Sequence, residues 1–317
     1  MSNPVASIWK TDLVTGTCGQ TITAYGRLVE PLHRIRGREI PDVLHFHLNG
    51  CPEIDVGAIL LLIYASHQAY LAGWHTKVTG KGSGLARLGR HLQSLCNPAT
   101  RSSIPHEPGE FLLREVPVQS EMVETLEKWA EGLRKDANAT EQEAALWQFQ
   151  IAEVVTNSFQ HGRLPGADMQ APLVAGQCDR EEGTVRLAVL DFGMTIPTRI
   201  EASTRFSRDA TEFPQGDEDS IYGKDDGDLI RFACQNGITS KSVSENQGRG
   251  LFSLVEEVKR NRGSVQIASR NGLVQFSEHA PEARQLSSKN TRIHEQLSGT
   301  LINVTLKLES RRDRNLQ

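Results

Sequence analysis

At residues 149–162 the chain reads FQIAEVVTNSFQHG. Within this stretch Glu153, Asn157 and His161 recur every four residues, slightly more than one helical turn, so one face of a helix would carry all three. The remaining residues are mostly apolar or small, and a polar stripe on a buried helix is costly unless a ligand satisfies it. Mg²⁺ with a phosphorylated ligand would do so, because an amide oxygen can bind the metal and a carboxylate can orient or deprotonate a nucleophile.

The composition is that of a folded protein without a strong charge bias. The 317 residues suffice for two domains of ordinary size, and 38% of them are hydrophobic, a normal share for a globular chain. Lys and Arg number 35 against 39 Asp and Glu, so the net charge is −4. Because a nucleic-acid surface needs a strongly basic domain, we expect no nucleic-acid partner.

Cysteine usage and the N-terminus indicate a cytoplasmic protein. The five cysteines are scattered and form no Cys-x-x-Cys pair, which argues against a disulfide framework and a structural zinc site. The first residues show no charged-then-apolar signal pattern, and the longest apolar run, residues 58–65, is too short to span a bilayer. We therefore expect no membrane association.

The first part of the chain alternates strand and helix signals, which predicts a small α/β domain over residues 1–96. Asp55 can cap a helix over residues 56–72, and Gly73 stands where a C-terminal glycine belongs. The other predicted elements are strands at 21–28, 43–48 and 74–79 and a helix at 85–95. Residues 97–114 begin with prolines and small polar residues without periodicity, which is typical of a linker.

A larger α/β domain is predicted over residues 115–308, followed by a tail at 309–317. Thr140 and Glu143 form a capping box that opens a helix running to His161, so this helix contains the polar stripe. The helix predicted before it, residues 120–135, has an apolar side made of Met122, Val123, Leu126, Trp129 and Leu133. Strands are expected at 173–178, 184–191, 264–269, 273–276 and 300–308, and helices at 249–261 and, short, at 228–234. The segment 198–247 is otherwise long and polar, which is typical of a functional lid or of a disordered segment.

Three short motifs follow the polar stripe in order. Asp191 and Gly193 end an apolar strand, where a carboxylate can accept a hydrogen bond from a ligand amino group and a glycine permits close approach of a flat ring. Gly248 and Gly250 open a helix, so that backbone N–H groups and the helix N-terminus can face a phosphate. The third motif, Gly299-Thr300, enters the last strand.

Together these features resemble the ATP-binding domain of the GHKL superfamily, shared by histidine kinases, DNA gyrase, the Hsp90 chaperone and MutL. The resemblance covers about residues 115–308 and is closest to the anti-sigma-factor serine kinases. It implies a Bergerat-type α/β sandwich in which helices cover one face of a mixed sheet. It also implies ATP and Mg²⁺ as cofactors and a lid over residues 198–247.

The resemblance assigns a role to each matching position. Glu153 and Asn157 match the Glu-x-x-x-Asn box, in which the Asn binds Mg²⁺ and the Glu is the catalytic base. The adenine side matches at three positions: Asp191 as the reader of the amino group, Gly193 beside it and Thr300 behind it. The phosphate side matches at Gly248 and Gly250 with Arg249 between them, and at Lys241, which could reach a phosphate.

One position departs from the family pattern. Where the family prefers a second glycine after the adenine-reading Asp, this chain has Thr195, which is expected to stiffen the entry to the lid or crowd the ribose. The histidine of the polar stripe, His161, sits at the end of its helix and is expected to be structural rather than catalytic.

The N-terminal domain resembles the STAS-like domains of anti-sigma antagonists and anion transporters. The resemblance rests on residues 53–58, on the apolar helix that follows and on Gly73 before the next strand. Antagonist STAS domains carry a phosphorylatable hydroxyl just after the Asp, whereas Asp55 is followed by Val56 and Gly57. A scaffold or docking role is therefore expected in place of phosphate acceptance.

Two functions remain open on the sequence. The first is Mg²⁺-dependent hydrolysis of ATP, or transfer of its γ-phosphate to a Ser or Thr of a protein partner, with a regulatory role. The second is a non-catalytic switch that docks a protein through the STAS-like domain when ATP binds, or an interaction module whose nucleotide site is degenerate. Relatives in this superfamily often form homodimers, which makes a homodimer a further possibility.

Overall fold

The computed structural model describes residues 8–12, 43–47, 56–71, 75–79, 112–116, 118–161, 171–180, 182–206, 225–235, 250–277 and 297–308. The chain forms two compact units, Met1–Glu110 and Phe111–Gln317. Their boundary falls inside the segment 97–114 that the sequence predicts as a linker. Among the described residues, no helix combines the length and the apolar character needed to cross a membrane.

The first unit contains a three-stranded parallel sheet and one described helix. The sheet has the order β1 (Ile8–Asp12), β2 (Val43–His47), β3 (His75–Thr79). Helix α2 (Val56–Leu71) connects β2 to β3, the kind of crossover that parallel strands require. Nine consecutive residues of α2, 56–64, are buried, as expected of a helix that is apolar on every side.

The sequence predicted β2, α2 and β3 to within one residue and missed β1. The expected strand at 21–28, the expected helix at 85–95 and the cap Asp55 lie outside the described residues.

The second unit is built on a six-stranded sheet of order β4-β5-β6-β9-β7-β8. Its strands are β4 (Leu112–Glu115), β5 (Leu173–Asp179), β6 (Thr184–Asp191), β7 (Ser264–Arg270), β8 (Gly272–Ser277) and β9 (Leu297–Lys307). All five pairings are antiparallel, so the predicted mixed sheet is wrong. Tight turns join β5 to β6 and β7 to β8, and such turns connect only antiparallel neighbours. The residues 112–114, expected in the linker, belong to β4.

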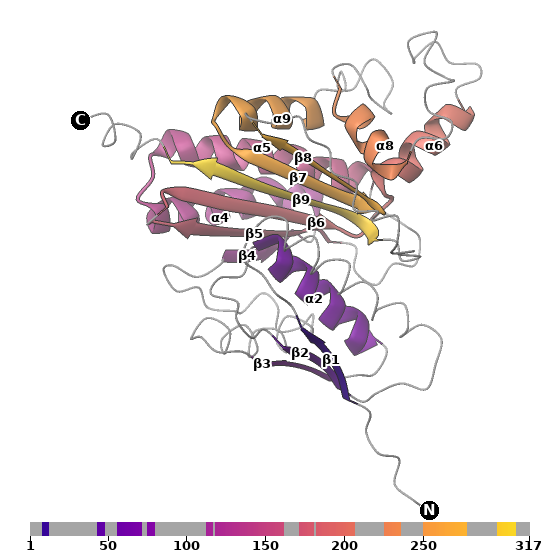
Figure 1. Cartoon of the computed structure of the whole chain (residues 1–317). Helices are drawn as coiled ribbons and strands as arrows, with labels where there is room; N and C mark the ends of the chain where they lie inside the picture. Colours follow the sequence, from indigo (N-terminus) through magenta and orange to yellow (C-terminus); the bar gives the residue numbers. More distant parts are fainter. Residues whose placement is uncertain are drawn as a thin grey trace, which may run out of the picture. The chain divides into compact units, whose positions relative to one another are not determined.

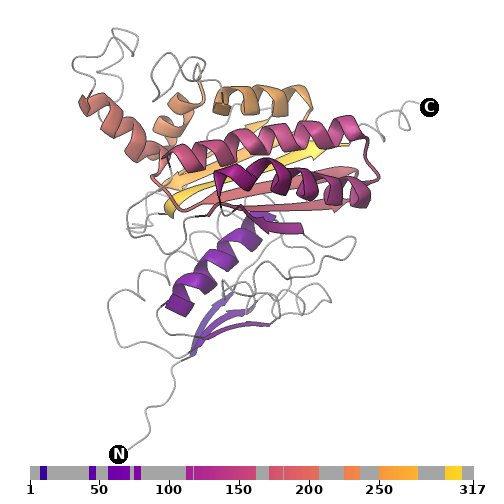
Figure 2. The same ribbon diagram turned by 180° about the vertical axis from the view of Figure 1, so that it is seen from behind.

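Helices α4 (Met122–Ala137), α5 (Glu141–His161) and α9 (Gly250–Arg260) cover one face of this sheet (Figure 1 and, from behind, Figure 2). Alternate strand residues point to that face. One register-aligned row crosses five strands and lies entirely in the core: Val174, Val189, Ile302, Ile267 and Val274. The sheet therefore supplies one apolar face to a helical layer.

A tight connection fixes α4 and α5 as a helical hairpin. Asn138 adopts the left-handed conformation (φ 51°) and ends α4, a position that Asn tolerates better than most residues. The predicted capping box is confirmed: the Thr140 N–H donates to Glu143 Oε2 at 2.8 Å, and the Glu143 N–H donates to Thr140 Oγ1 at 3.2 Å. This pair satisfies two N–H groups at the start of the helix that carries the polar stripe.

The apolar side of α4 is confirmed for Leu126, Trp129 and Leu133, which are buried, and wrong for Val123, which is 57% exposed. Met122, which was also predicted on the apolar side, packs against the core and is confirmed. Residues 122, 126, 129 and 133 form the i, i+4, i+7, i+11 stripe of a helix, and residue 123 lies beside this stripe.

Two helices stand within or next to the predicted lid. Helix α8 (Asp226–Ala233) lies near the short helix expected at 228–234, and Asp225 caps it by accepting a hydrogen bond from the Asp228 N–H at 2.9 Å. Helix α6 (Ile196–Phe206) was not predicted, so the expectation of irregular structure from residue 198 is wrong as far as residue 206. Residues 207–224 and 236–247, the rest of the predicted lid, lie outside the described residues.

Candidate functional site

The polar stripe of α5 meets the first residue of α9. Glu153 and Asn157 are half-buried, and Gly250 begins the helix beside them. A Cβ atom added to Gly250 would lie 3.1 Å from Asn157 Nδ2 and 3.3 Å from Glu153 Oε2. The structure thus brings together a carboxylate, an amide and a helix N-terminus whose free N–H groups favour an anion.

Asp191 ends β6 and forms the second part of the site. Its Oδ1 accepts hydrogen bonds from the Gly193 N–H at 3.0 Å and the Thr300 N–H at 3.2 Å. The Ser158 hydroxyl of α5 lies 3.4 Å from Oδ2 and 3.1 Å from the Val154 carbonyl oxygen. Because the hydroxyl has a single hydrogen, these two oxygens compete for it. Oδ2 therefore keeps most of its capacity to accept a hydrogen bond from a ligand.

The carboxyl group of Asp191 is strongly perturbed. Burial raises its pKa to about 6, and the hydrogen bonds from Gly193, Thr300 and Ser158 lower the pKa only in part. Ionisable groups with such shifts are concentrated at functional sites. Asp191 is ionised at neutral pH and becomes a neutral acid as the pH falls through about 6.

The start of β9 lies close beside the end of β6, its antiparallel neighbour in the sheet. Gly299 has φ 117°, a conformation that favours glycine, and a Cβ atom there would lie 2.0 Å from the Asp191 carbonyl oxygen. This close approach sets the register in which Thr300 pairs with Asp191 and donates its N–H to the carboxylate.

Ser269, at the end of β7, belongs to the same part of the molecule and was missed by the sequence reasoning. Its buried hydroxyl oxygen accepts a hydrogen bond from the Ile196 N–H at 2.9 Å and lies 3.0 Å from Thr300 Oγ1 and 3.1 Å from the Gly299 carbonyl. One assignment satisfies every group: Thr300 donates to Ser269, and Ser269 donates to Gly299. The sequence signal that could have identified Ser269 was a hydroxyl residue at the end of a predicted strand.

Thr195, which replaces the family's glycine, caps α6. Its Oγ1 accepts a hydrogen bond from the Thr198 N–H at 3.3 Å and lies 2.7 Å from Thr198 Oγ1, and its carbonyl accepts from the Arg199 N–H. A threonine cap explains why a helix begins here. The side chain is buried and its hydroxyl is engaged by the helix.

Gln150 is a second polar residue that the sequence reasoning missed. It lies on the same side of α5 as Glu153, one turn earlier, and is 3% exposed. Neither its amide nitrogen nor its amide oxygen has a hydrogen-bond partner among the residues that the structure describes. A buried amide without partners is costly, which makes the stripe longer and more polar than the sequence suggested.

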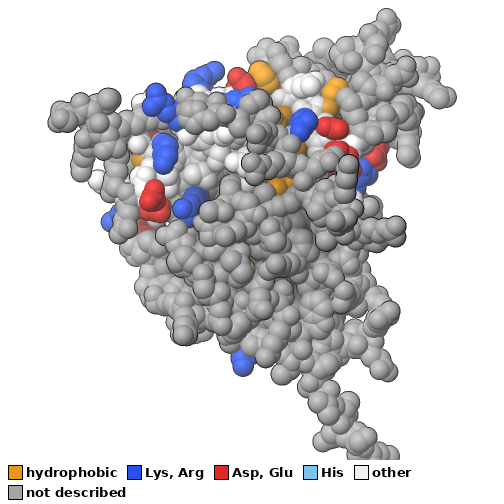
Figure 3. Space-filling model, in the orientation of Figure 1, with side chains coloured by type: hydrophobic (Ala, Val, Ile, Leu, Met, Phe, Trp, Pro, Cys, Tyr) orange, Lys and Arg blue, Asp and Glu red, His pale blue; other side chains and the backbone are white. Residues whose placement is uncertain are grey.

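The remaining predicted residues of the phosphate side, Lys241, Gly248 and Arg249, lie outside the described residues, as does the side chain of His161. Within the described part of the chain, no group of three or more His, Cys, Asp or Glu residues could hold a metal ion. Acidic and basic side chains are interspersed over the described surface of the second unit in the view of Figure 3.

No protein-family model matches this chain, and no curated protein shows significant sequence similarity to it. The resemblance to the GHKL superfamily and to STAS-like domains rests on the residues of the chain alone.

Proposed function

We propose that residues 115–308 bind ATP in the manner of the GHKL superfamily. The observation that carries the proposal is the meeting of Glu153, Asn157 and Gly250, which come from two helices about a hundred residues apart. The perturbed carboxylate of Asp191, hydrogen-bonded to Thr300 and within reach of α5, adds a second recognition element.

The adenine end of the proposed site would be Asp191. An ionised carboxylate is purely an acceptor, and its Oδ2 has the capacity to take a hydrogen bond from the exocyclic amino group of adenine. Gly193 offers no side chain beside it, so a flat ring can approach the backbone. Because the pKa of Asp191 is about 6, this recognition is expected to operate above that pH.

The phosphate end would lie at the N-terminus of α9. The space in front of Gly250, which a Cβ atom would fill, is bordered by Asn157, and Mg²⁺ commonly takes few protein oxygens together with phosphate oxygens. The Asn157 amide oxygen would hold the Mg²⁺ ion after the amide turns, because its Nδ2 is now the atom nearest to Gly250, and the bound ion would neutralise phosphate charge. Glu153, one turn away, would orient and deprotonate water or a partner's Ser or Thr hydroxyl.

The proposal is tested by titrating the protein with Mg·ATP in a calorimeter and by measuring phosphate release. Wild type is expected to bind ATP, Asp191→Asn to bind it more weakly, and Glu153→Gln to bind it while losing turnover. If wild type does not bind ATP or ADP at all, the proposal is wrong.

The alternative of a non-catalytic switch is an outcome of the same experiment. Tight binding of Mg·ATP with the same negligible phosphate release for wild type and Glu153→Gln, alone and with candidate protein substrates, would favour it. The STAS-like first unit would then be the docking site for a partner, and partner affinity would differ with and without nucleotide.

A further inference from the structure

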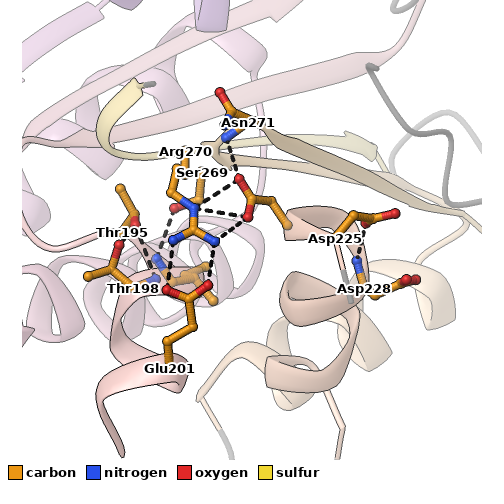
Figure 4. A network of polar contacts seen from close by, with 10 residues as sticks. Thr195, Thr198, Glu201, Asp225, Asp228, Ser269, Arg270 and Asn271 are labelled. Carbon is orange, nitrogen blue, oxygen red and sulfur yellow. Dashed lines mark hydrogen bonds and ion pairs between the residues drawn. The ribbon is translucent and has the colours of Figure 1, made fainter. Parts of the chain in front are cut away.

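Arg270 joins three elements of the second unit through one side chain (Figure 4). Its Nη1 and Nη2 donate to the two carboxylate oxygens of Glu201 in α6 at 2.8 and 2.7 Å. Its Nε lies 2.9 Å from both carboxylate oxygens of Asp226, the first residue of α8, and its Nη2 also donates to Asp226. The guanidinium thus binds two carboxylates from two helices at once.

The charges of this cluster make Arg270 difficult to replace. Two carboxylates face one cation, and the hydrogen bonds that Arg270 donates to Glu201 and then to Asp226 raise the pKa of Arg270 further, so it stays charged. Arg270 is 16% exposed and Asp226 12% exposed, so water screens the pair only in part. Without the guanidinium, two like charges on α6 and α8 would face each other. Lysine keeps the charge but lacks the planar fork that serves both partners.

Apolar contacts also attach the two helices held by Arg270, and Ile230 of α8 is buried in the main core. Ile200, Leu229 and Phe232 form a small apolar cluster of their own between α6 and α8, and Ile196 contacts both this cluster and the main core. The β7–β8 turn supports α8 closely, because a Cβ atom on Gly272 would lie 2.6 Å from the Asp226 backbone. The Asn271 N–H in the same turn also donates to Asp226 at 2.9 Å.

Arg270 directly follows Ser269, a residue beside the proposed nucleotide site. Ser269 accepts the Ile196 N–H at the start of α6, and the next residue, Arg270, binds Glu201 in the second turn of the same helix. A register shift in the pairing of β7 with β9 falls between Ser269 and Arg270, where Arg270 has φ 56° and pairs with Leu297. The segment from Asp191 to Ile196 is thereby held at both ends.

We propose that Arg270 is a positioning residue for the nucleotide site: by clamping α6 and α8 to the end of β7, it fixes the backbone from Asp191 to Ile196 against which adenine would lie. This inference rests on the proposed function. It assigns to Arg270 no contact with the nucleotide, so its loss should affect adenine recognition and leave the phosphate end unchanged.

The test uses Arg270→Lys in the full chain, with Arg231→Lys as a matched control. Arg231 forms an exposed ion pair with Asp228 on α8, and such pairs contribute little. Arg270→Lys is expected to weaken ADP binding roughly tenfold, the effect of losing charge-assisted hydrogen bonds, and to leave the affinity for inorganic pyrophosphate unchanged. Arg231→Lys is expected to change neither affinity.

Two further measurements separate positioning from general destabilisation. Amide hydrogen exchange at Gly193, Ile196 and Arg199 should accelerate in Arg270→Lys, whereas exchange in α4 and α5 should not. Glu201→Gln, which keeps the shape of the partner, should reproduce the weaker ADP binding and the faster exchange. It should also keep a cooperative unfolding transition.

The outcomes distinguish this inference from the function on which it rests. A wild type that binds no nucleotide overturns both proposals. If wild type binds ADP, and Arg270→Lys and Glu201→Gln bind it with the same affinity as wild type, only the positioning role is overturned. Equal loss of ADP and pyrophosphate affinity, or faster exchange throughout the unit, also overturns it, because Arg270 would then support the fold and not the adenine end.

Discussion

Individual residues of the candidate site are constrained by the space and the charge around them. Gly250 and Gly299 are both glycines at close approaches, but the neighbours differ: flexible side chains of α5 at Gly250, and rigid backbone of β6 at Gly299. Asp191 carries a charge that burial disfavours, although three donors surround it. These differences predict different consequences for substitution.

The pKa of Asp191 predicts a pH dependence of stability. Because its folded-state pKa of about 6 lies above its ordinary value of 3.8, the folded protein holds more protons than the unfolded chain between these values. The contribution of Asp191 to the free energy of unfolding therefore falls as the pH rises from about 4 to about 6 and stays low above this range. Urea unfolding of wild type and Asp191→Asn at several pH values checks this. The free energy of unfolding of Asp191→Asn should increase relative to that of wild type as the pH rises. A difference between the two that does not change with pH would contradict the raised pKa of Asp191.

The two glycines make a matched pair. Gly299→Ala combines a φ of 117° with a 2.0 Å contact to backbone and should cost about 3 kcal/mol or more of unfolding free energy. Gly250→Ala meets only side chains at 3.1 and 3.3 Å and should change stability by about 1 kcal/mol or less, while weakening Mg·ATP binding. Chemical denaturation and calorimetry give both quantities. Equal stability losses for the two variants would contradict this account of the contacts.

At the scale of elements, α5 is the helix that carries Glu153 and Asn157. The capping box lies at the N-terminus of this helix, far from Glu153. Loss of the capping hydroxyl in Thr140→Ala should cost about 1 kcal/mol of unfolding free energy, because the Glu143 N–H loses its partner. Nucleotide affinity should not change. Gln142→Ala, an exposed substitution in the same turn, is the control and should stay within about 0.5 kcal/mol of wild type. An equal effect of both variants would show that the box contributes nothing.

At the scale of the whole molecule, the two units have separate sheets, one parallel and one antiparallel, and the second has its own apolar core. Residues 111–317 produced alone should therefore unfold in one cooperative transition and bind ADP with the affinity of the full chain. Thermal unfolding and calorimetry measure both. Loss of cooperative unfolding in this fragment would mean that the second unit depends on the first for its fold.

The sequence alone determined the local elements and the residue types at their ends. Periodicity located α5 and its polar stripe, α2 and most strands of the second sheet, since the alternation of buried and exposed positions is a property of neighbouring residues. The capping box was predicted correctly for the same reason, because both of its residues lie in one turn. The strand end at Asp191 was also visible in the pattern, whereas β9 begins at Leu297 and not at the predicted Thr300.

Only the tertiary structure decided which of these ends meet. The antiparallel order of the sheet depends on strand pairings between distant residues, and local periodicity carries no information about them. Helix α6 was hidden because its start depends on a threonine cap and on the Ile196 N–H finding Ser269, 73 residues later in the chain. The contacts of Gly250 with α5 and the three-element clamp of Arg270 arise in the same way, from packing that brings together segments far apart in sequence.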